Sequence, residues 1–356
     1  MEFEKILEIP PYAPAKSQKS GILLKRLEEL TASHRKACAP YGRILQVLGI
    51  PESFASYYDI PFLPVRLFKE LDLKSIPEQE VFKMMTSSGT TGQAVSRIYL
   101  DRVTSANQQK ALVKIVSEFT GKGRLPMLII DSSSVLKDRA RFSARGAGIL
   151  GFSILASDRM YALDEDMQLD WEGIQAFLEK HQGKRILLFG FTYIVWRHFY
   201  QELLKKPGMI DLSNGILIHG GGWKKLANEA VDPHEFQRCL REVCGLVDIH
   251  DYYGMAEQTG CIYMQCEQGH LHASLYSDVI MRRMQDFSVC GIGEEGVIQV
   301  VSAIPESYPG HSLLTEDRGV LLGEDDCPCG RKGKYFKVLG RIPDVEVRGC
   351  SDTYEG

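Results

Sequence analysis

Short apolar runs alternate with amphipathic stretches through the middle of the chain. Met127–Asp131, Arg185–Gly190 and Gly215–His219 are compact apolar runs whose length and composition predict buried β-strands. The stretches between them, such as Trp171–His181 and Trp196–Lys205, have helix-like patterns. This alternation favours a mostly parallel α/β sheet flanked by helices, in which ligands bind at the carboxyl ends of the strands. We therefore expect an α/β fold class for the largest part of the chain.

The two ends of the chain have a different pattern. Apolar residues recur at helical spacing from about Ser17 to Val47, which predicts a helical arm. After about Cys266, strand-like runs separated by Gly and Pro turns predict a smaller β-rich part. We therefore expect three segments: a helical arm at 1–80, an α/β core at 81–263 and a β-rich subdomain at 264–356.

Composition narrows the class of protein. The 356 residues are 44% hydrophobic and 25% charged, which is typical of a soluble globular protein with ample core. The net charge of −4 and the lack of a basic run argue against nucleic acid as a partner. The N-terminus is charged and no stretch is long and apolar enough to span a bilayer, so we expect a cytoplasmic protein without a membrane partner. Nine cysteines, an odd number, favour free thiols or a metal site over a disulfide framework.

A loop rich in Ser, Thr and Gly spans Thr86–Arg97. Its glycines let the backbone turn tightly and approach a ligand, and its hydroxyl and N–H groups can surround phosphate oxygens. The alternative is a polar turn without a ligand, and the Gly-Lys-Ser/Thr ending of a Walker loop is missing. The residues expected at the phosphates are Ser87, Ser88, Gly89, Thr90, Thr91 and Gly92. Arg97 is a candidate bidentate partner of the same phosphates.

Four further elements follow this loop along the chain. The first is a run of glycines after a predicted strand, Gly220, Gly221 and Gly222. Tyr253–Gly254 then offers an aromatic face, and Glu257 offers a carboxylate for Mg²⁺ beside phosphates. Asp317 is a candidate acceptor for ribose hydroxyls, and Arg341 lies in the last element. Each element alone can also be an ordinary turn, a chance match or a solvated charge pair, so their order and spacing carry the prediction.

In this order, the five elements resemble the motifs of the adenylate-forming superfamily, the acyl-CoA synthetases and their relatives. That superfamily has a phosphate loop, an adenine-contacting turn, a Tyr-Gly-x-Thr-Glu element, a Thr-Gly-Asp element and a Gly-Arg-x-Asp hinge. The resemblance implies ATP and Mg²⁺ as cofactors. The implied roles are phosphate binding by Ser87–Gly92, adenine contact by Gly220–Gly222 and Tyr253, Mg²⁺ binding by Glu257, and ribose contact by Asp317 with Arg341 nearby.

The sequence departs from the superfamily pattern in four ways. Ser96-Arg97 stands where a lysine usually closes the phosphate loop, and Ala256 replaces a phosphate-contacting threonine. Glu316 replaces the glycine before the ribose-binding aspartate, which weakens the assignment of Asp317. The chain ends at Gly356, so we expect the mobile C-terminal domain with its catalytic lysine to be absent.

A narrower resemblance covers nearly the whole chain. The matching motifs are Thr86–Gly92, Ser143–Gly148, Phe189–Tyr193, His219–Lys224 and Arg348–Ser351. They resemble the acyl-protein synthetase family, the long-chain-fatty-acid–luciferin-component ligases of bacterial bioluminescence operons. This resemblance implies that a fatty acid is activated as acyl-AMP and then carried on a cysteine near the C-terminus, for which Cys350 is the matching position. The pKa of a thiol falls beside a cation such as Arg348, which favours attack on an acyl-adenylate, whereas the alternative is a small buried thiol.

The remaining cysteines predict a zinc site. Cys327 and Cys329 form a knuckle-like pair, and Cys266 lies earlier, close to His270 and His272. Three thiolates and one imidazole match a closed tetrahedral Zn²⁺ site. The phenylacetate-CoA ligase-like branch resembles this pattern and favours His272 as the fourth ligand, with His270 as the alternative. Turn cysteines without a metal remain the competing interpretation.

We therefore expect an enzyme, an AMP-forming acid–thiol ligase. It would activate a carboxylic acid, which the family resemblance implies is a fatty acid. It would then transfer the acyl group to a protein cysteine, its own Cys350 or one on a partner reductase or carrier protein. The catalytic candidates are Cys350, Glu257 and Arg97. An acyl- or aryl-CoA ligase of the phenylacetate type is the first alternative. A nucleotide-binding protein without turnover is the second, and Ala256 and the missing lysine are the arguments for it.

Overall fold

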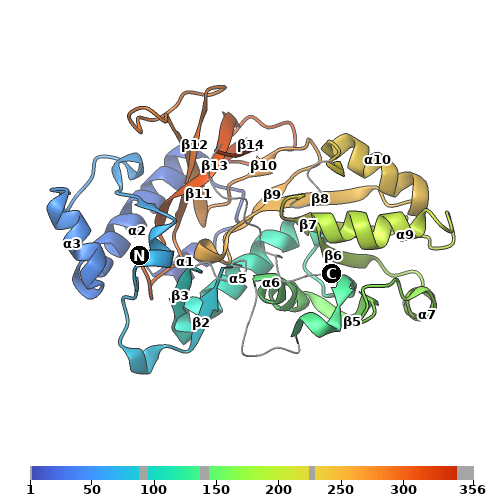
Figure 1. Ribbon diagram of the computed structural model, residues 1–356. Helices are drawn as coiled ribbons and strands as arrows, with labels where there is room; N and C mark the ends of the chain where they lie inside the picture. The colour runs from blue at the N-terminus through green and yellow to red at the C-terminus, as the bar shows by residue number, and fades with distance from the viewer. Residues whose placement is uncertain (1, 88–94, 137–143, 224–228, 343–356) are drawn as a thin grey trace. The chain divides into compact units, whose positions relative to one another are not determined.

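The computed structural model describes residues 2–87, 95–136, 144–223 and 229–342, and these residues form two compact units. One unit contains the described residues up to Ile115 together with those from Gly254 onward, and the other contains the described part of Val116–Tyr253. Figure 1 colours the chain by residue number, from blue at the N-terminus to red at the C-terminus. Among the described residues, no helix combines the length and the apolar composition that crossing a bilayer requires.

The unit within Val116–Tyr253 is built on five parallel strands in the order β8-β7-β6-β4-β5. Their apolar side chains are largely buried, because parallel strands with helical crossovers are covered on both faces. The strands are β4 (Leu125–Ser132), β5 (Ala156–Leu163), β6 (Ile186–Phe191), β7 (Gly215–Gly220) and β8 (Asp248–Tyr253). The predicted parallel α/β sheet is therefore confirmed, and three of its strands match the predicted apolar runs.

Helices of this unit begin and end at residues that suit those positions. Asp232 caps α10 by accepting hydrogen bonds from two backbone N–H groups, and Gly245 ends it in the left-handed conformation at φ +77°. Asp170 caps α7 in the same way through Gly173 N–H. After β6, the segment η4 (Val195–Tyr200) is a π-helix. The other helices are α6 (Ala144–Ser153), α7 (Trp171–Lys180), α8 (Thr192–Ile194), α9 (Gln201–Leu203), α10 (Pro233–Cys244) and the short η3 (Ser133–Leu136).

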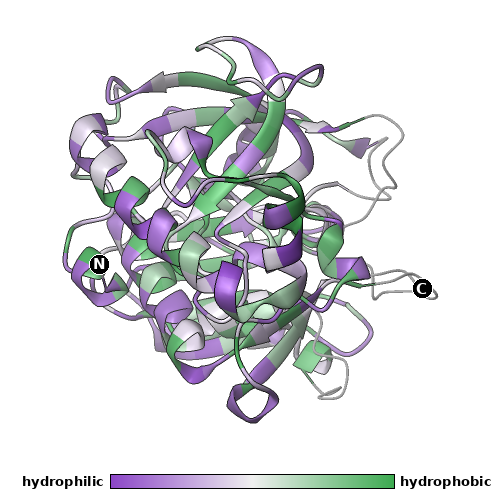
Figure 2. Cartoon of the chain, turned by 90° about the vertical axis from the view of Figure 1, so that its left-hand side faces the viewer, coloured by the Kyte–Doolittle hydropathy of each residue, from purple (hydrophilic) through white to green (hydrophobic). Residues whose placement is uncertain are grey.

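The other unit contains antiparallel strands in the order β11-β12-β13-β14-β10-β9, with β1 parallel to β13. A separate ribbon is formed by β2 and β3. Figure 2 shows hydrophilic residues in purple and hydrophobic residues in green, and both colours occur along helices and along strands. The strands are β1 (Leu63–Pro64), β2 (Lys83–Thr86), β3 (Arg97–Leu100), β9 (Tyr263–Gln265), β10 (Leu271–His272), β11 (Ser277–Arg282), β12 (Glu295–Ser302), β13 (Ser312–Glu324) and β14 (Lys334–Arg341).

The predicted helical arm is two helices that meet at Cys38. Pro40 occupies the first turn of the second helix, where its missing N–H is tolerated, but it would interrupt a continuous helix. The α-helices of the first unit are α1 (Phe3–Leu7), α2 (Lys16–Ala37), α3 (Ala39–Val47), α4 (Leu67–Glu70) and α5 (Arg102–Thr120), which runs past the boundary at Ile115. Its 3₁₀ helices are η1 (Tyr57–Asp59), η2 (Glu78–Glu80) and η6 (Ala256–Gln258).

A buried polar network joins the N-terminal helices to the antiparallel strands. Asp278 on β11 accepts a hydrogen bond from the Tyr57 hydroxyl at 2.6 Å. Its two oxygens also lie 3.4 Å from Lys19 Nζ of α2 and 3.3 Å from Lys334 Nζ of β14. All three charged side chains are at most 3% exposed. Each buried charge has lost its hydration, and its oppositely charged partners offset that cost. The N-terminal helices therefore belong to the same compact unit as the antiparallel strands.

Candidate functional site

The ends of the Ser/Thr/Gly loop are held together by its first and last serines. Thr86 and Arg97 face each other across the β2–β3 ribbon. One residue further on, Ser96 N–H donates to Ser87 Oγ at 2.9 Å and Ser87 N–H donates to the Ser96 carbonyl at 3.2 Å. The loop is therefore closed at its base. The expected phosphate ligands Ser88, Gly89, Thr90, Thr91 and Gly92 lie outside the described residues.

Arg97 points to an acidic partner at this base. Its Nε lies 2.9 Å from Asp72 Oδ1, and the Arg97 side chain is 38% exposed. Asp72 also accepts a hydrogen bond from the Tyr99 hydroxyl at 2.8 Å. The Tyr99 hydroxyl, followed by the Arg97 guanidinium, holds the pKa of Asp72 below its usual value. The sequence patterns did not single out Asp72, because an acidic residue in a short loop has no distinctive spacing.

The first of the three predicted glycines, Gly220, ends β7, and Gly221 and Gly222 follow it. A Cβ on Gly220 would lie 2.5 Å from the ring of Tyr252, so only glycine fits beside this ring. Gly221 has φ +82°, a conformation that side chains disfavour. Gly222 and Gly221 are exposed. The glycine run thus leaves bare backbone at the strand end, where ligands of parallel α/β sheets bind.

Polar side chains gather at the carboxyl ends of β6, β7 and β8. His219 and Asp251 are partners in the parallel register of β7 and β8, with His219 Nδ1 3.7 Å from Asp251 Oδ1. Thr192 follows β6, and its Oγ1 lies 2.9 Å from the same His219 nitrogen. Burial lowers the pKa of His219 to about 3, and the nearby His250 adds to this shift, so the imidazole is neutral.

Asp251 differs from His219 in its contact with solvent. Burial raises the pKa of the Asp251 carboxyl. The Asp251 side chain is 43% exposed, however, so contact with water limits this rise. Sequence reasoning missed Asp251 and Thr192 as members of this group. The available signal was their position directly at or after strand ends, which β8 did not reveal because its sequence, Asp-Ile-His-Asp-Tyr-Tyr, is mostly polar.

Glu257, the predicted Mg²⁺ ligand, lies in the buried helix η6. Tyr308 O–H donates to its carbonyl at 2.9 Å, and Gln258 Nε2–H donates to the carbonyls of Val300 and Gly310. Burial raises the pKa of Glu257, the charge of Glu316 adds to the rise, and Lys69 opposes it. A buried carboxylate has lost most of its hydration, so a bound cation stabilises its charged form more than it would stabilise an exposed carboxylate. Tyr253 and Gly254 precede it, at the end of β8.

Asp317 and Arg341 face each other on neighbouring antiparallel strands. They are register partners of β13 and β14, and Arg341 Nε lies 3.9 Å from Asp317 Oδ1. Thr315 Oγ1 accepts the Asp317 N–H at 3.1 Å, which helps to fix the backbone of β13 at Asp317. The structure therefore brings together the two residues that the resemblance assigned to the ribose.

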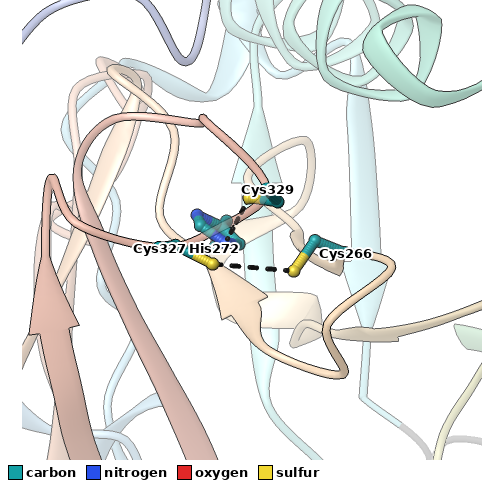
Figure 3. A group of neighbouring side chains, drawn as sticks. All are labelled: Cys266, His272, Cys327 and Cys329. Carbon is teal, nitrogen blue, oxygen red and sulfur yellow. Dashed lines mark hydrogen bonds between the residues drawn. The ribbon is translucent and has the colours of Figure 1, made fainter.

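The four predicted metal ligands form a compact cluster (Figure 3). Cys266 follows β9, His272 lies on β10, and Cys327 and Cys329 come from the segment between β13 and β14. Their ligand atoms all lie within 4.8 Å of one another. Cys266 Sγ is 4.0 Å from Cys327 Sγ, and His272 Nε2 is 3.4 Å from Cys329 Sγ.

These separations fit a tetrahedral zinc site. A Zn–S distance of about 2.3 Å places two sulfurs of a tetrahedron roughly 3.8 Å apart. His272 is fully buried, and burial lowers its pKa to about 4, so a neutral imidazole is available. His270 also lies close, with Nδ1 3.3 Å from Cys327 Sγ, and it stacks on Tyr335. The cluster can thus hold a metal ion through His272, and His270 is a neighbour of the ligand set.

The remaining site predictions divide between the two units or lie outside the described residues. Gly220–Gly222 and Tyr253 belong to the Val116–Tyr253 unit, whereas Ser87, Arg97, Glu257, Asp317 and Arg341 belong to the other. Cys350, the expected acyl carrier, lies outside the described residues together with Arg348. The site assignments therefore stay predictions.

Comparison with known proteins identifies relatives over most of the chain. The family model described as "Acyl-protein synthetase, LuxE" matches residues 2–355. A long-chain-fatty-acid–luciferin-component ligase of Vibrio harveyi is 26% identical over 327 residues, which cover 87% of this chain and 81% of that protein. A protein of the same name from Aliivibrio fischeri is 22% identical and covers 82% of this chain and 77% of its own.

Solved structures with the same fold are adenylate-forming ligases. An open conformation of 2-hydroxyisobutyryl-CoA ligase, in complex with 2-HIB-AMP and CoA, has a TM-score of 0.70 at 16% identity. The match covers 96% of this chain and 79% of that one. The same ligase in the postadenylation state has a TM-score of 0.71 at 14% identity, over 94% and 70% of the two chains. The predicted fold and the predicted family are thereby confirmed, and the chain belongs to the acyl-protein synthetase (LuxE) family.

Proposed function

We propose that this chain activates a long-chain fatty acid with ATP and transfers the acyl group to a protein thiol. The observation that carries the proposal is the family match over residues 2–355, together with relatives named long-chain-fatty-acid–luciferin-component ligases. The prediction of an AMP-forming ligase is confirmed by the same match. The length of the acyl chain and the identity of the acceptor are the finer parts of the proposal.

In the first half-reaction, a carboxylate oxygen of the acid attacks the α-phosphorus of ATP and pyrophosphate leaves. The Ser/Thr/Gly loop closed by Ser87 and Ser96 would neutralise the phosphate charge, with Arg97 beside it. Glu257 would hold Mg²⁺, which lowers the repulsion between the phosphates and the incoming carboxylate. Bare backbone at Gly220–Gly222 would receive the adenine, and Asp317 would accept the ribose hydroxyls.

In the second half-reaction, a thiolate attacks the acyl carbonyl and AMP leaves, so that a thioester forms. Cys350 is the proposed acceptor in this chain, and a reductase or carrier protein is the proposed next acceptor. Such chemistry needs reduced thiols, and the eight described cysteines are all free, so we place the reaction in the cytoplasm.

We further propose that the cluster of Cys266, His272, Cys327 and Cys329 binds a structural Zn²⁺ ion. The closed set of four protein ligands leaves no open position for substrate, which is typical of structural zinc. Two of the ligands come from the segment between β13 and β14, so the ion would tie this segment to β9 and β10. Metal analysis of the purified chain tests this proposal: we expect one zinc per chain, and a value near zero would exclude it.

Pyrophosphate release and intact-mass measurements test the function together. With ATP, Mg²⁺ and a series of fatty acids, we expect release that depends on chain length and a mass increase of one acyl group. Cys350→Ser should still release the first pyrophosphate but lose the stable mass increase, and Cys290→Ser is the matched control. Equal acylation of Cys350→Ser would exclude Cys350 as the acceptor. Formation of acyl-CoA without protein acylation would favour a CoA ligase, and ATP binding without release would favour a protein without turnover.

A further inference from the structure

One face of α5 carries three polar side chains that are buried. Thr104, Asn107 and Gln108 are spaced i, i+3 and i+4 along the helix, so their side chains are neighbours on one face. Their exposed fractions are only 0%, 1% and 4%. The next residue, Gln109, is exposed. The helix therefore turns a polar face toward the interior of its unit, where each polar atom needs a hydrogen-bond partner.

The polar atoms on this face have no hydrogen-bond partner among the described residues. Both Nδ2 and Oδ1 of the Asn107 amide are without a partner, and so are Thr104 Oγ1 and Gln108 Nε2. A buried amide or hydroxyl that makes no hydrogen bond has lost its hydration without compensation, which destabilises the folded state. Native proteins rarely leave such groups unsatisfied. These atoms therefore point to a bound ligand on this face of α5.

The segment around η6 packs against the same part of α5, within one compact unit. A Cβ on Gly260 would lie 2.6 Å from both Cα and the carbonyl oxygen of Gln108, so the two backbones are in direct contact. Gln258, two residues before this glycine, is 2% exposed. Its Nε2–H group donates to the carbonyls of Val300 and Gly310, which fixes the orientation of the amide because carbonyls only accept. Among the described residues, Gln258 Oε1 then has no partner.

We infer that buried water binds between α5 and η6, held by Asn107, Gln108 and Gln258. A cation would bind only the oxygens of these amides, and an anion would bind only their N–H groups. Water both donates and accepts, and a buried water molecule typically makes about three hydrogen bonds to otherwise unsatisfied groups. The mixture of unpaired donors and acceptors therefore selects water.

The water has a defined place in the chain. It joins α5, the helix that follows the Ser/Thr/Gly loop and β3, to η6, which contains Glu257. Water-mediated hydrogen bonds of this kind are nearly as favourable in enthalpy as direct ones. The inference concerns how these two elements are held together, and it does not depend on the proposed function.

A crystal structure of the full chain, at a resolution that shows ordered water, is the direct test. We expect a water oxygen within about 3.2 Å of the Asn107 amide or Gln108 Nε2, and a water oxygen at the same distance from Gln258 Oε1. Direct hydrogen bonds from these three side chains to protein groups, with no water between them, would overturn the inference. An ion with only oxygen ligands at about 2.0–2.6 Å would also overturn it.

The sign of a stability change gives an independent test in solution. Gln108→Met keeps the length of the side chain and removes its amide. If Gln108 binds water, the variant loses that hydrogen bond, and we expect the melting temperature to fall by roughly 2 °C. If the site is dry, the variant instead removes an unsatisfied buried group, and the melting temperature should rise.

Gln109→Met is the matched control, because it makes the same change of residue on the exposed side of the same helix. Its melting temperature should stay within about 1 °C of the wild-type value. A melting temperature of Gln108→Met that equals or exceeds that of Gln109→Met would overturn the inference. Wild-type crystals decide the question by themselves if Gln108→Met does not fold.

Discussion

Acidification should destabilise the protein through His34, which is fully buried in α2. Its Nε2–H donates to the Pro305 carbonyl at 3.0 Å, because a carbonyl only accepts, and its Nδ1 then accepts from Ser75 O–H at 2.7 Å. The ring stacks on His311 with 5.1 Å between centroids. Burial lowers the pKa of His34 to about 4, and the nearby charge of Arg26 contributes.

The size and sign of the effect follow from the two pKa values. The reference pKa of histidine in the unfolded chain is 6.5, and the folded value is about 4, a difference of about 2.5 units. One unit corresponds to about 1.36 kcal/mol, so neutral His34 accounts for roughly 3 kcal/mol of pH-dependent stability. The folded pKa is depressed, so this stability is complete above 6.5, falls as the pH decreases toward 4, and falls no further below that value.

The assay is chemical denaturation of wild-type protein and His34→Gln at a series of pH values across this window. We expect the variant to be less stable at neutral pH, but its unfolding free energy should fall less steeply with acid, by up to about 1.4 kcal/mol per pH unit. His234→Gln, which removes an exposed imidazole at the start of α10, should keep the wild-type slope. An unchanged slope in His34→Gln would refute the reasoning, since the buried imidazole would then not be the group that titrates.

Two further substitutions test the glycine run and the cysteine cluster. Gly220→Ala places a Cβ 2.5 Å from the Tyr252 ring, which is itself packed against Phe152 and Phe189, so we expect a loss of about 1–3 kcal/mol in stability and weaker ATP binding by calorimetry. Gly222→Ala, which meets nothing within 4 Å, should lose no stability, and equal losses in the two variants would contradict the steric argument. Cys327→Ser should lower both the zinc content and the melting temperature, whereas Cys290→Ser should retain the zinc. A Cys327→Ser protein with full zinc content would show that Cys327 is not a ligand.

The sequence by itself determined the parallel α/β unit and the order of the candidate motifs. Apolar runs such as those of β4, β6 and β7 are legible because strands buried on both faces need apolar residues at nearly every position. In contrast, β8 and β13 were not predicted, because β8 is mostly polar and β13 contains Glu316-Asp317-Arg318 among half-buried positions. The spacing of the glycines and the pairing of Cys327 with Cys329 involve residues that are close together in the sequence. These features can therefore be recognised without the structure.

Only the tertiary structure decided which distant side chains meet. Cys266 reaches Cys327 because β10 pairs with β14, a contact that joins segments about sixty residues apart and leaves no trace in local spacing. The register of β7 and β8 places His219 beside Asp251 in the same way. Asp72 meets Arg97 because Ser307 holds their two segments together through hydrogen bonds, and hydrogen bonds between distant segments impose no periodicity on either sequence.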